Sequence, residues 1–152
     1  MKDIILKITG KTISTLPKPA PGQSIDEPVE FITVGQMQSR GNVTQITYEE
    51  SELSGIEGCK TSLIITPGRL RMARSGGSIP GGTVMEFEKG KRCTGMYETP
   101  LGSIGMEILT DKVSDFKCDE ENISKMSVEY AISLKGLLEA RKTLDIEVRN
   151  KN

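Results

Sequence analysis

The fold is decided by residues 60–88, which read KTSLIITPGRLRMARSGGSIPGGTVMEFE. Three runs in this stretch alternate between apolar and polar side chains: 60–66, 70–75 and 83–88. Alternation with a period of two is typical of a strand that buries one face. Proline and glycine residues separate the runs, as in turns, and the connections are too short for parallel crossovers. The stretch therefore predicts successive antiparallel hairpins.

The same pattern continues from this stretch in both directions. Further strands are expected at 3–11, 29–37, 43–50, 92–98, 103–112, 123–134 and in a segment that ends near Val148. A proline-rich loop is expected at about 16–28, because three prolines within five residues cannot lie in a central strand. Residues 134–144 fit a hairpin or a short helix, and a hairpin is favoured because Gly136 is costly inside a helix.

So many short strands must either stack as two sheets or close on themselves, because exposed strand edges invite aggregation. A meander of successive hairpins closes most simply as a barrel. The sequence thus predicts an all-β protein in which residues 1–152 form a single domain. In this domain an antiparallel meander closes into a β-barrel of about 8–10 strands.

Alternation also predicts which side chains face the interior of the barrel. The expected inward residues are Ile46, Tyr48, Glu50, Leu70, Met72, Arg74, Met85, Phe87, Ile104, Met106, Ile108, Val128, Tyr130 and Ile132. Several methionines, Met96 among them, occupy strand positions where they would pack the core or line an adaptable binding cavity.

Two charged residues, Glu50 and Arg74, fall at the ends of these otherwise apolar faces. An unpaired ion inside a barrel is very costly, so each side chain either reaches water at the barrel mouth or has a partner. A guanidinium at that place can bind a carboxylate or phosphate through two hydrogen bonds. The alternative is a structural ion pair of Arg74 with Glu50 or Glu98.

Composition excludes several kinds of chemistry. The 152 residues contain no histidine, so imidazole-based triads and histidine-containing zinc sites are absent. A net charge of −1 argues against a protein built to hold nucleic acid or an anionic membrane. Three cysteines are too few and too widely spaced for a disulfide framework. We expect no metal, no cofactor and a cytoplasmic location, since the N-terminal apolar run is too short for a signal peptide.

Three further motifs have plain structural interpretations. Residues 48–55 are acidic, but adjacent strand residues point to opposite faces, so the neighbouring glutamates form no facing acid–base pair. Residues 75–82 are rich in glycine but lack the lysine of a phosphate-binding loop. Arg69, Arg71 and Arg74, with nearby Lys60, form a local basic patch without interleaved aromatic residues, which favours a solvated strand face over a nucleic-acid site.

Three motifs, taken in order, resemble a known family: YEESELSG at 48–55, RMARSG at 71–76 and YETPLG at 97–102. They are similar to motifs of the YwiB-like family of small bacterial proteins, a domain of unknown function. The similarity runs from about residue 29 to the C-terminus. It implies a calycin-like, lipocalin-type β-barrel, in agreement with the alternation, and it implies no activity. Barrels of this kind enclose one small ligand or are filled by side chains.

The preferred hypothesis is a non-enzymatic cytosolic protein whose barrel takes up a small, mainly apolar molecule with an anionic end near Arg74. The candidate contacts are Tyr48, Glu50, Arg74, Met96, Tyr97 and Glu98. One alternative is a scaffold or interaction module with a solid barrel. The other is an enzyme that uses glutamate, arginine and tyrosine, which no established catalytic motif supports. No nucleic-acid or membrane partner is expected, and the low net charge is compatible with a homodimer.

Overall fold

The computed structural model describes residues 2–16, 29–49, 59–76, 82–99, 102–135 and 138–151. None of these residues forms a helix, and so none forms one that could cross a membrane. The strands are β1 (Lys2–Leu16), β2 (Val29–Arg40), β3 (Val43–Glu49), β4 (Lys60–Thr66), β5 (Arg69–Ser75), β6 (Gly82–Glu88), β7 (Arg92–Thr99), β8 (Gly102–Val113), β9 (Lys117–Cys118), β10 (Ser124–Leu134) and β11 (Leu138–Asn150).

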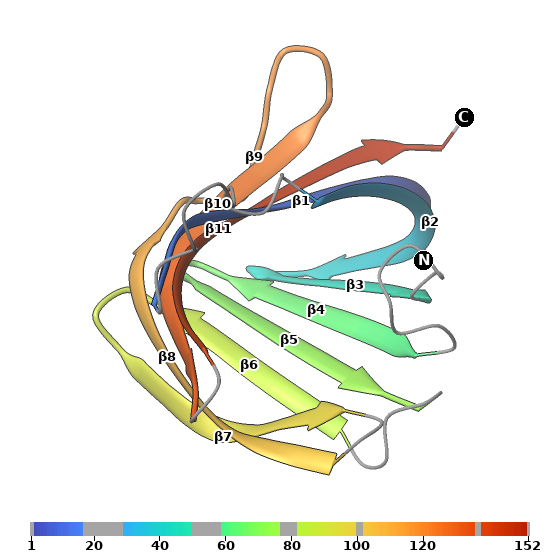
Figure 1. The fold of residues 1–152 in the computed structure, drawn as a ribbon. Helices are drawn as coiled ribbons and strands as arrows, with labels where there is room; N and C mark the ends of the chain where they lie inside the picture. Colours follow the sequence, from blue (N-terminus) through green and yellow to red (C-terminus); the bar gives the residue numbers. More distant parts are fainter. Residues whose placement is uncertain are drawn as a thin grey trace.

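The strands form one antiparallel sheet that rolls up into a nearly closed barrel (Figure 1). Their order across the sheet is β6-β5-β4-β3-β2-β1-β11-β10-β8-β7, and the two-residue β9 pairs with β10. Most neighbours are consecutive in the sequence, while the pairing of β1 with β11 joins the first strand to the last. This topology confirms the predicted all-β meander barrel.

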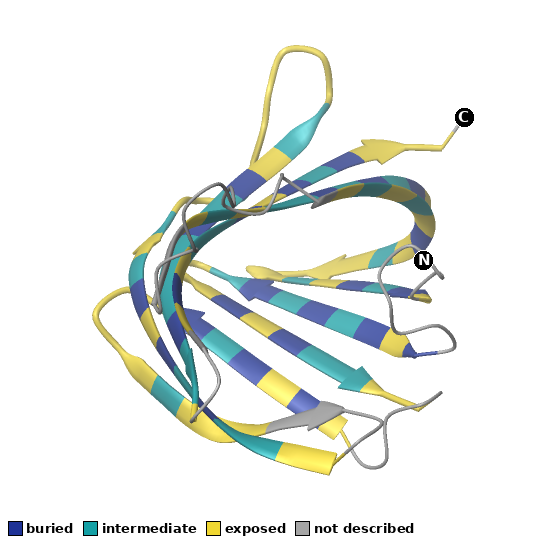
Figure 2. Ribbon diagram, viewed as in Figure 1, coloured by how far each residue is buried: buried dark blue, intermediate teal, exposed yellow. Residues whose placement is uncertain are grey.

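Buried and exposed residues alternate along β3 to β6, as Figure 2 shows. The predicted inward positions are confirmed at Ile46, Tyr48, Leu70, Met72, Met85, Phe87, Met106, Ile108, Val128 and Ile132, which are all buried. Arg74, Ile104 and Tyr130 are half-buried. The expectation that Met96 packs in the core is wrong, because its side chain is 49% exposed. Met96 and Cys93 are three residues apart in β7 and therefore on opposite faces, and it is Cys93 that packs against the core.

One strand ends later than predicted, and one pairing decides between the two predicted alternatives. β1 continues to Leu16 instead of ending at residue 11, because its second half pairs with β11 across a shift in register between Thr12 and Ser14. The expected proline-rich loop otherwise lies outside the described residues. The predicted hairpin near residue 136 is confirmed over the helix, since Leu134 pairs with Leu138.

Gly35 allows β2 to pass closely over β3. The first part of β2 pairs with β1 up to Met37, and the last part pairs with β3 from Gln36 onward. A Cβ atom on Gly35 would lie 2.8 Å from the backbone oxygen of Thr47, which is closer than real Cβ atoms come. The absence of a side chain therefore lets the curled strand in Figure 1 change partners at this point.

Candidate functional site

Four inward side chains form a continuous row across β3, β4, β5 and β6. Tyr48 is opposite Thr61 in the backbone register, Thr61 is opposite Arg74, and Arg74 is opposite Thr83. Tyr48, Thr61 and Thr83 are buried, and Arg74 is half-buried. We call these four residues the polar row.

Cross-strand neighbours on one face of a sheet have Cβ atoms about 4.5–5.5 Å apart, so the members of the polar row are close enough to act together. The guanidinium of Arg74 carries five N–H donors in a planar fork. The phenol and the two threonine hydroxyls each donate one hydrogen bond and accept others. On the inner wall of the barrel, this set of groups matches the oxygen atoms of an anion.

Apart from Thr44, which is half-buried and opposite Ile65, the rest of the inner wall on these strands is apolar. The row next to the polar row consists of Ile46, Leu63, Met72 and Met85, which are paired in register and all buried. The row after that contains Ile65, Leu70 and Phe87. Because a strand rises about 3.3 Å per residue, successive rows are about 6.6 Å apart. The polar row therefore directly adjoins an apolar interior.

Aromatic packing and a buried thiol hold the surroundings of the polar row. The ring of Tyr48 lies 6.1 Å from the ring of Phe31, with an angle of 44° between their planes. At the outer end of β4 and β5, the fully buried Cys59 thiol donates a hydrogen bond to the Gly76 carbonyl oxygen at 3.2 Å. This contact extends the pairing of the two strands beyond their last ladder residues.

The structure brings together two of the predicted site residues, Tyr48 and Arg74, and adds two that were missed, Thr61 and Thr83. Both threonines carry a recognisable signal. Thr61 is in phase with two buried residues of β4, and Thr83 is in phase with two buried residues of β6. Like Arg74, each is a polar residue at the end of an otherwise apolar face.

Among the described side chains, none of the other predicted site residues lies in the polar row. Glu50 lies outside the described residues. Tyr97 and Glu98 belong to β7, where their backbones pair with Ile104 and Ser103, and their side chains are outside the described part. The alternative prediction, an ion pair of Arg74 with Glu50 or Glu98, therefore involves side chains outside the described part of the structure as well.

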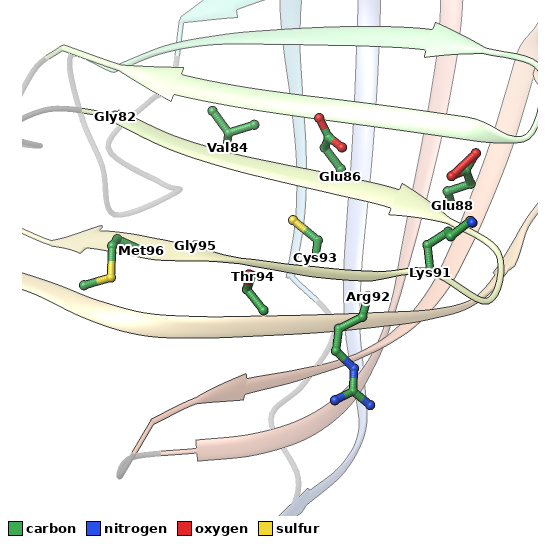
Figure 3. Close-up of a pocket in the computed structure, with 10 residues that line it drawn as sticks. All are labelled: Gly82, Val84, Glu86, Glu88, Lys91, Arg92, Cys93, Thr94, Gly95 and Met96. Carbon is green, nitrogen blue, oxygen red and sulfur yellow. The ribbon is translucent and has the colours of Figure 1, made fainter.

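Met96 lies on the outer surface, at a groove of about 660 Å³ between β6 and β7 (Figure 3). The groove is lined by Gly82, Val84, Glu86 and Glu88 of β6, and by Lys91, Arg92, Cys93, Thr94, Gly95 and Met96 at and after the turn into β7.

The outer face next to this groove is charged and balanced. Arg69 and Arg71 of β5 form ion pairs with Glu86 of β6, with N–O distances of 2.8 and 3.5 Å. Both arginines are exposed, as expected for a solvated strand face, whereas Arg74 of the same predicted patch is half-buried on the inner wall. In the part of the chain that the structure describes, no group of three or more histidine, cysteine, aspartate or glutamate side chains is arranged to hold a metal ion.

A family model described as "Domain of unknown function (DUF1934)" matches residues 14–146. The chain belongs to the DUF1934 family. Among solved structures it is similar to the crystal structure of the ywiB protein from Bacillus subtilis, with a TM-score of 0.73 and 18% sequence identity. The match covers 99% of this chain and 93% of the other. No curated protein matches the sequence.

These matches confirm the YwiB-like resemblance and the barrel fold. At 18% identity the likeness to the ywiB protein concerns the fold alone. The description of the DUF1934 family names no activity. The chemistry of the polar row in this DUF1934 chain follows from its own geometry.

Proposed function

We propose that this protein binds a small, mainly apolar molecule inside its barrel, with an anionic end of the molecule held at Arg74. It does so without catalysing a reaction. The observation that supports the proposal is the polar row, in which a guanidinium, a phenol and two hydroxyls stand side by side on the inner wall. Buried charged and polar groups rarely improve stability over well-packed apolar ones, so such a row favours a binding role.

The anionic end is a carboxylate or a phosphate. A guanidinium binds either group through two parallel hydrogen bonds, and these strengthen where water is excluded. Thr61 and Thr83 flank Arg74 on its two neighbouring strands, so their hydroxyls can donate to the same oxygen atoms. Three adjacent strands therefore contribute donors to one anion.

The apolar part of the molecule lies against the next row of the inner wall. Met72 lies two residues before Arg74, Met85 lies two residues after Thr83, and the two methionines are opposite each other in the next row. Methionine side chains are flexible and adapt to irregular apolar shapes. An acyl chain that ends in a carboxylate combines both requirements.

Isothermal titration calorimetry with decanoate tests the proposal. Wild-type protein is expected to bind decanoate saturably. The Arg74→Met variant is expected to bind it about ten- to hundredfold more weakly, because a hydrogen bond to a charged group contributes about 1.5–3 kcal/mol. Decanol lacks the anionic end, so its affinity is expected to be the same for both proteins. Arg71→Met is the matched control, since Arg71 is on the same strand and faces solvent.

Two results would remove the proposal. The first is the absence of saturable binding of decanoate and of decyl phosphate to the wild-type protein. The second is equal decanoate affinity of wild-type and Arg74→Met proteins that have the same thermal stability. A loss of affinity that is equally large in Arg71→Met would also exclude a specific role of the inward arginine.

A further inference from the structure

A second row of polar side chains crosses the other half of the barrel wall. Lys142 of β11 is opposite Thr12 of β1 on one side and Tyr130 of β10 on the other. Tyr130 is in turn opposite Thr110 of β8. We call these four residues the lysine row.

The lysine row is on the inner face of the barrel wall. Lys142, Tyr130 and Thr110 are each in phase with buried apolar residues of their own strand. These residues are Ala140 and Leu144 on β11, Val128 and Ile132 on β10, and Met106 and Ile108 on β8. Thr110 is itself buried, and Lys142 and Tyr130 are half-buried. Because side chains two residues apart share one face of a strand, all three belong to the inner wall.

The lysine row and the polar row are on opposite sides of the barrel interior (Figure 1). Among the ten strands of the sheet order, β5 with Arg74 is second and β11 with Lys142 is seventh, so the two strands are opposite each other. The ring of Tyr130 lies 4.8 Å from the ring of Phe87 on β6. Phe87 is four residues from Thr83 of the polar row, which is about 13 Å along the strand. The two rows therefore lie at different depths in the barrel.

The described inner wall between the two rows is apolar. On β6 it consists of Met85 and Phe87, which are both buried. On β11, the inward residues that follow Lys142 are Leu144, Ile146 and Val148, and they are buried too. A molecule that reaches from one row to the other thus passes apolar groups in between.

Two groups of the lysine row have no partner in the part of the chain that the structure describes. The Thr110 side chain is 1% exposed, and its hydroxyl forms no hydrogen bond with a described residue. The Lys142 ammonium has no described carboxylate within ion-pair distance. Buried hydroxyls are normally hydrogen-bonded, and charges inside proteins are normally paired. Both groups therefore favour a bound anion that supplies the missing oxygen atoms.

We propose that the lysine row holds a second anionic group of the molecule inside the barrel. This inference rests on the proposed function, in which Arg74 holds the first anionic group. The ligand is then an apolar chain with a carboxylate at each end, a long-chain dicarboxylate. Lys142 supplies the opposite charge, and the Thr110 hydroxyl donates a hydrogen bond to the same carboxylate.

Isothermal titration calorimetry with decanedioate and dodecanedioate tests the proposal. Decanoate and dodecanoate, which have the same lengths and one carboxylate each, are the matched ligands. We expect the wild type to bind the better dicarboxylate about tenfold or more tightly than the matched monocarboxylate. In Lys142→Met, the dicarboxylate is expected to bind about tenfold or more weakly than in the wild type, while the affinity for the monocarboxylate stays the same.

Other variants separate the lysine row from general charge effects and from the polar row. Lys112→Met is the matched control, because Lys112 is an exposed lysine whose ammonium pairs with Glu129 at 3.6 Å. It is expected to bind both ligands like the wild type. Arg74→Met is expected to weaken the binding of both ligands, which is the result that belongs to the proposed function.

Thr110→Val removes the hydroxyl and keeps the shape of the side chain. It is expected to weaken binding of the dicarboxylate severalfold and to leave binding of the monocarboxylate unchanged. The melting temperature of the ligand-free protein is expected to be no lower than in the wild type, because the hydroxyl has no partner among the described residues. This variant decides the question if Lys142→Met is unstable.

Three outcomes overturn the proposal and leave the proposed function standing. The first is a wild type that binds the monocarboxylate through Arg74 and binds the dicarboxylate no more tightly. The second is a dicarboxylate affinity that is unchanged in both Lys142→Met and Thr110→Val. The third is an equally large loss of dicarboxylate affinity in Lys112→Met. Conversely, dicarboxylate binding that depends on Lys142, without an effect of Arg74→Met on either ligand, supports the lysine row as an anion site and removes the role of Arg74.

Discussion

At the scale of single residues, position 35 requires glycine because any side chain there would clash with β3. Replacing it with alanine forces a Cβ atom to within 2.8 Å of the Thr47 backbone oxygen, and a backbone atom cannot move aside cheaply. We expect Gly35→Ala to lower the free energy of unfolding by about 1–3 kcal/mol, measured by urea denaturation. In Gly10→Ala, where the new Cβ has open space, we expect no loss. Equal losses in the two variants would contradict the steric explanation.

Phe87 links β6 to the opposite part of the wall by packing. Its side chain is fully buried, and its ring lies 4.8 Å from the ring of Tyr130 on β10 in an edge-to-face arrangement. We expect Phe87→Ala to lower the free energy of unfolding by about 3–5 kcal/mol in guanidinium denaturation. Val84→Ala on the exposed face of the same strand is expected to change it by less than about 0.5 kcal/mol. A small effect of Phe87→Ala would show that β6 is held mainly by β5.

The residues of the candidate site differ in how far the sequence predicts them. Arg74 is recognisable because a charge at an inward strand position demands an explanation. Tyr48 is recognisable from its phase with Ile46. Thr61 and Thr83 are harder to recognise, because threonine is common in strands on either face. What places all four in one row is the register between strands. Alternation within a strand limits that register to steps of two residues but does not choose among those steps.

At the scale of elements, the loop that joins β9 to β10 is held by one carboxylate. Asp119 accepts hydrogen bonds from the backbone N–H of Ile123 at 3.0 Å and of Glu121 at 2.8 Å. Asn122 completes the turn with a φ of 62°. We expect Asp119→Ala to speed hydrogen exchange at the Ile123 and Glu121 amides severalfold, measured by NMR. Asp115→Ala, which removes only an exposed ion pair with Lys117, is the control.

The same loop is expected to depend on pH. The backbone hydrogen bond from Ile123 is the largest effect and lowers the pKa of Asp119. Desolvation comes second and raises it, and the backbone of Glu121 and the charge of Lys125 lower it further, so that the pKa is lowered overall. A carboxyl whose pKa is lower in the folded state stabilises that state fully above its ordinary pKa, about 3.9. The contribution is lost as the pH falls through the lowered pKa. Protection of the two amides that is unchanged at pH 2 would contradict this.

Element boundaries are predictable where alternation is clean and less so where pairing partners decide. The limits of β4, β5 and β6 follow from Pro-Gly and glycine turns. The second half of β1 does not alternate cleanly, and it remains a strand because β11 pairs with it up to Leu16. A partner more than a hundred residues away in the sequence is invisible to a local pattern.

At the scale of the whole molecule, the barrel follows from the sequence because many short strands need to remove their edges. The break in pairing between β6 and β7 does not follow from it. Alternation predicts which face of β6 or β7 is buried. It does not predict whether the backbone edge of either strand is hydrogen-bonded, because the side chains alternate in the same way in both cases. The interruption between two consecutive strands is a property of the closed sheet, in which β6 and β7 are the two ends of the strand order.

The interrupted wall predicts an uneven distribution of local stability. We expect the slowest backbone amides in hydrogen exchange to lie in β1, β10 and β11, which are each paired on both sides. The amides of β6 and β7 that face the break between these two strands are expected to exchange faster than those that face β5 and β8. Uniformly slow exchange across β6 and β7 would contradict a break in the pairing there.

The central claim is that the polar row binds the anionic end of a small molecule inside the barrel, and native mass spectrometry tests it most directly. Wild-type, Arg74→Met and Arg71→Met proteins are purified from the same cells, and their native masses are compared with their denatured masses. The account predicts an additional non-covalent mass in the wild-type and Arg71→Met proteins that is lost or reduced in Arg74→Met. No additional mass in the wild type, or the same additional mass in Arg74→Met, would contradict it.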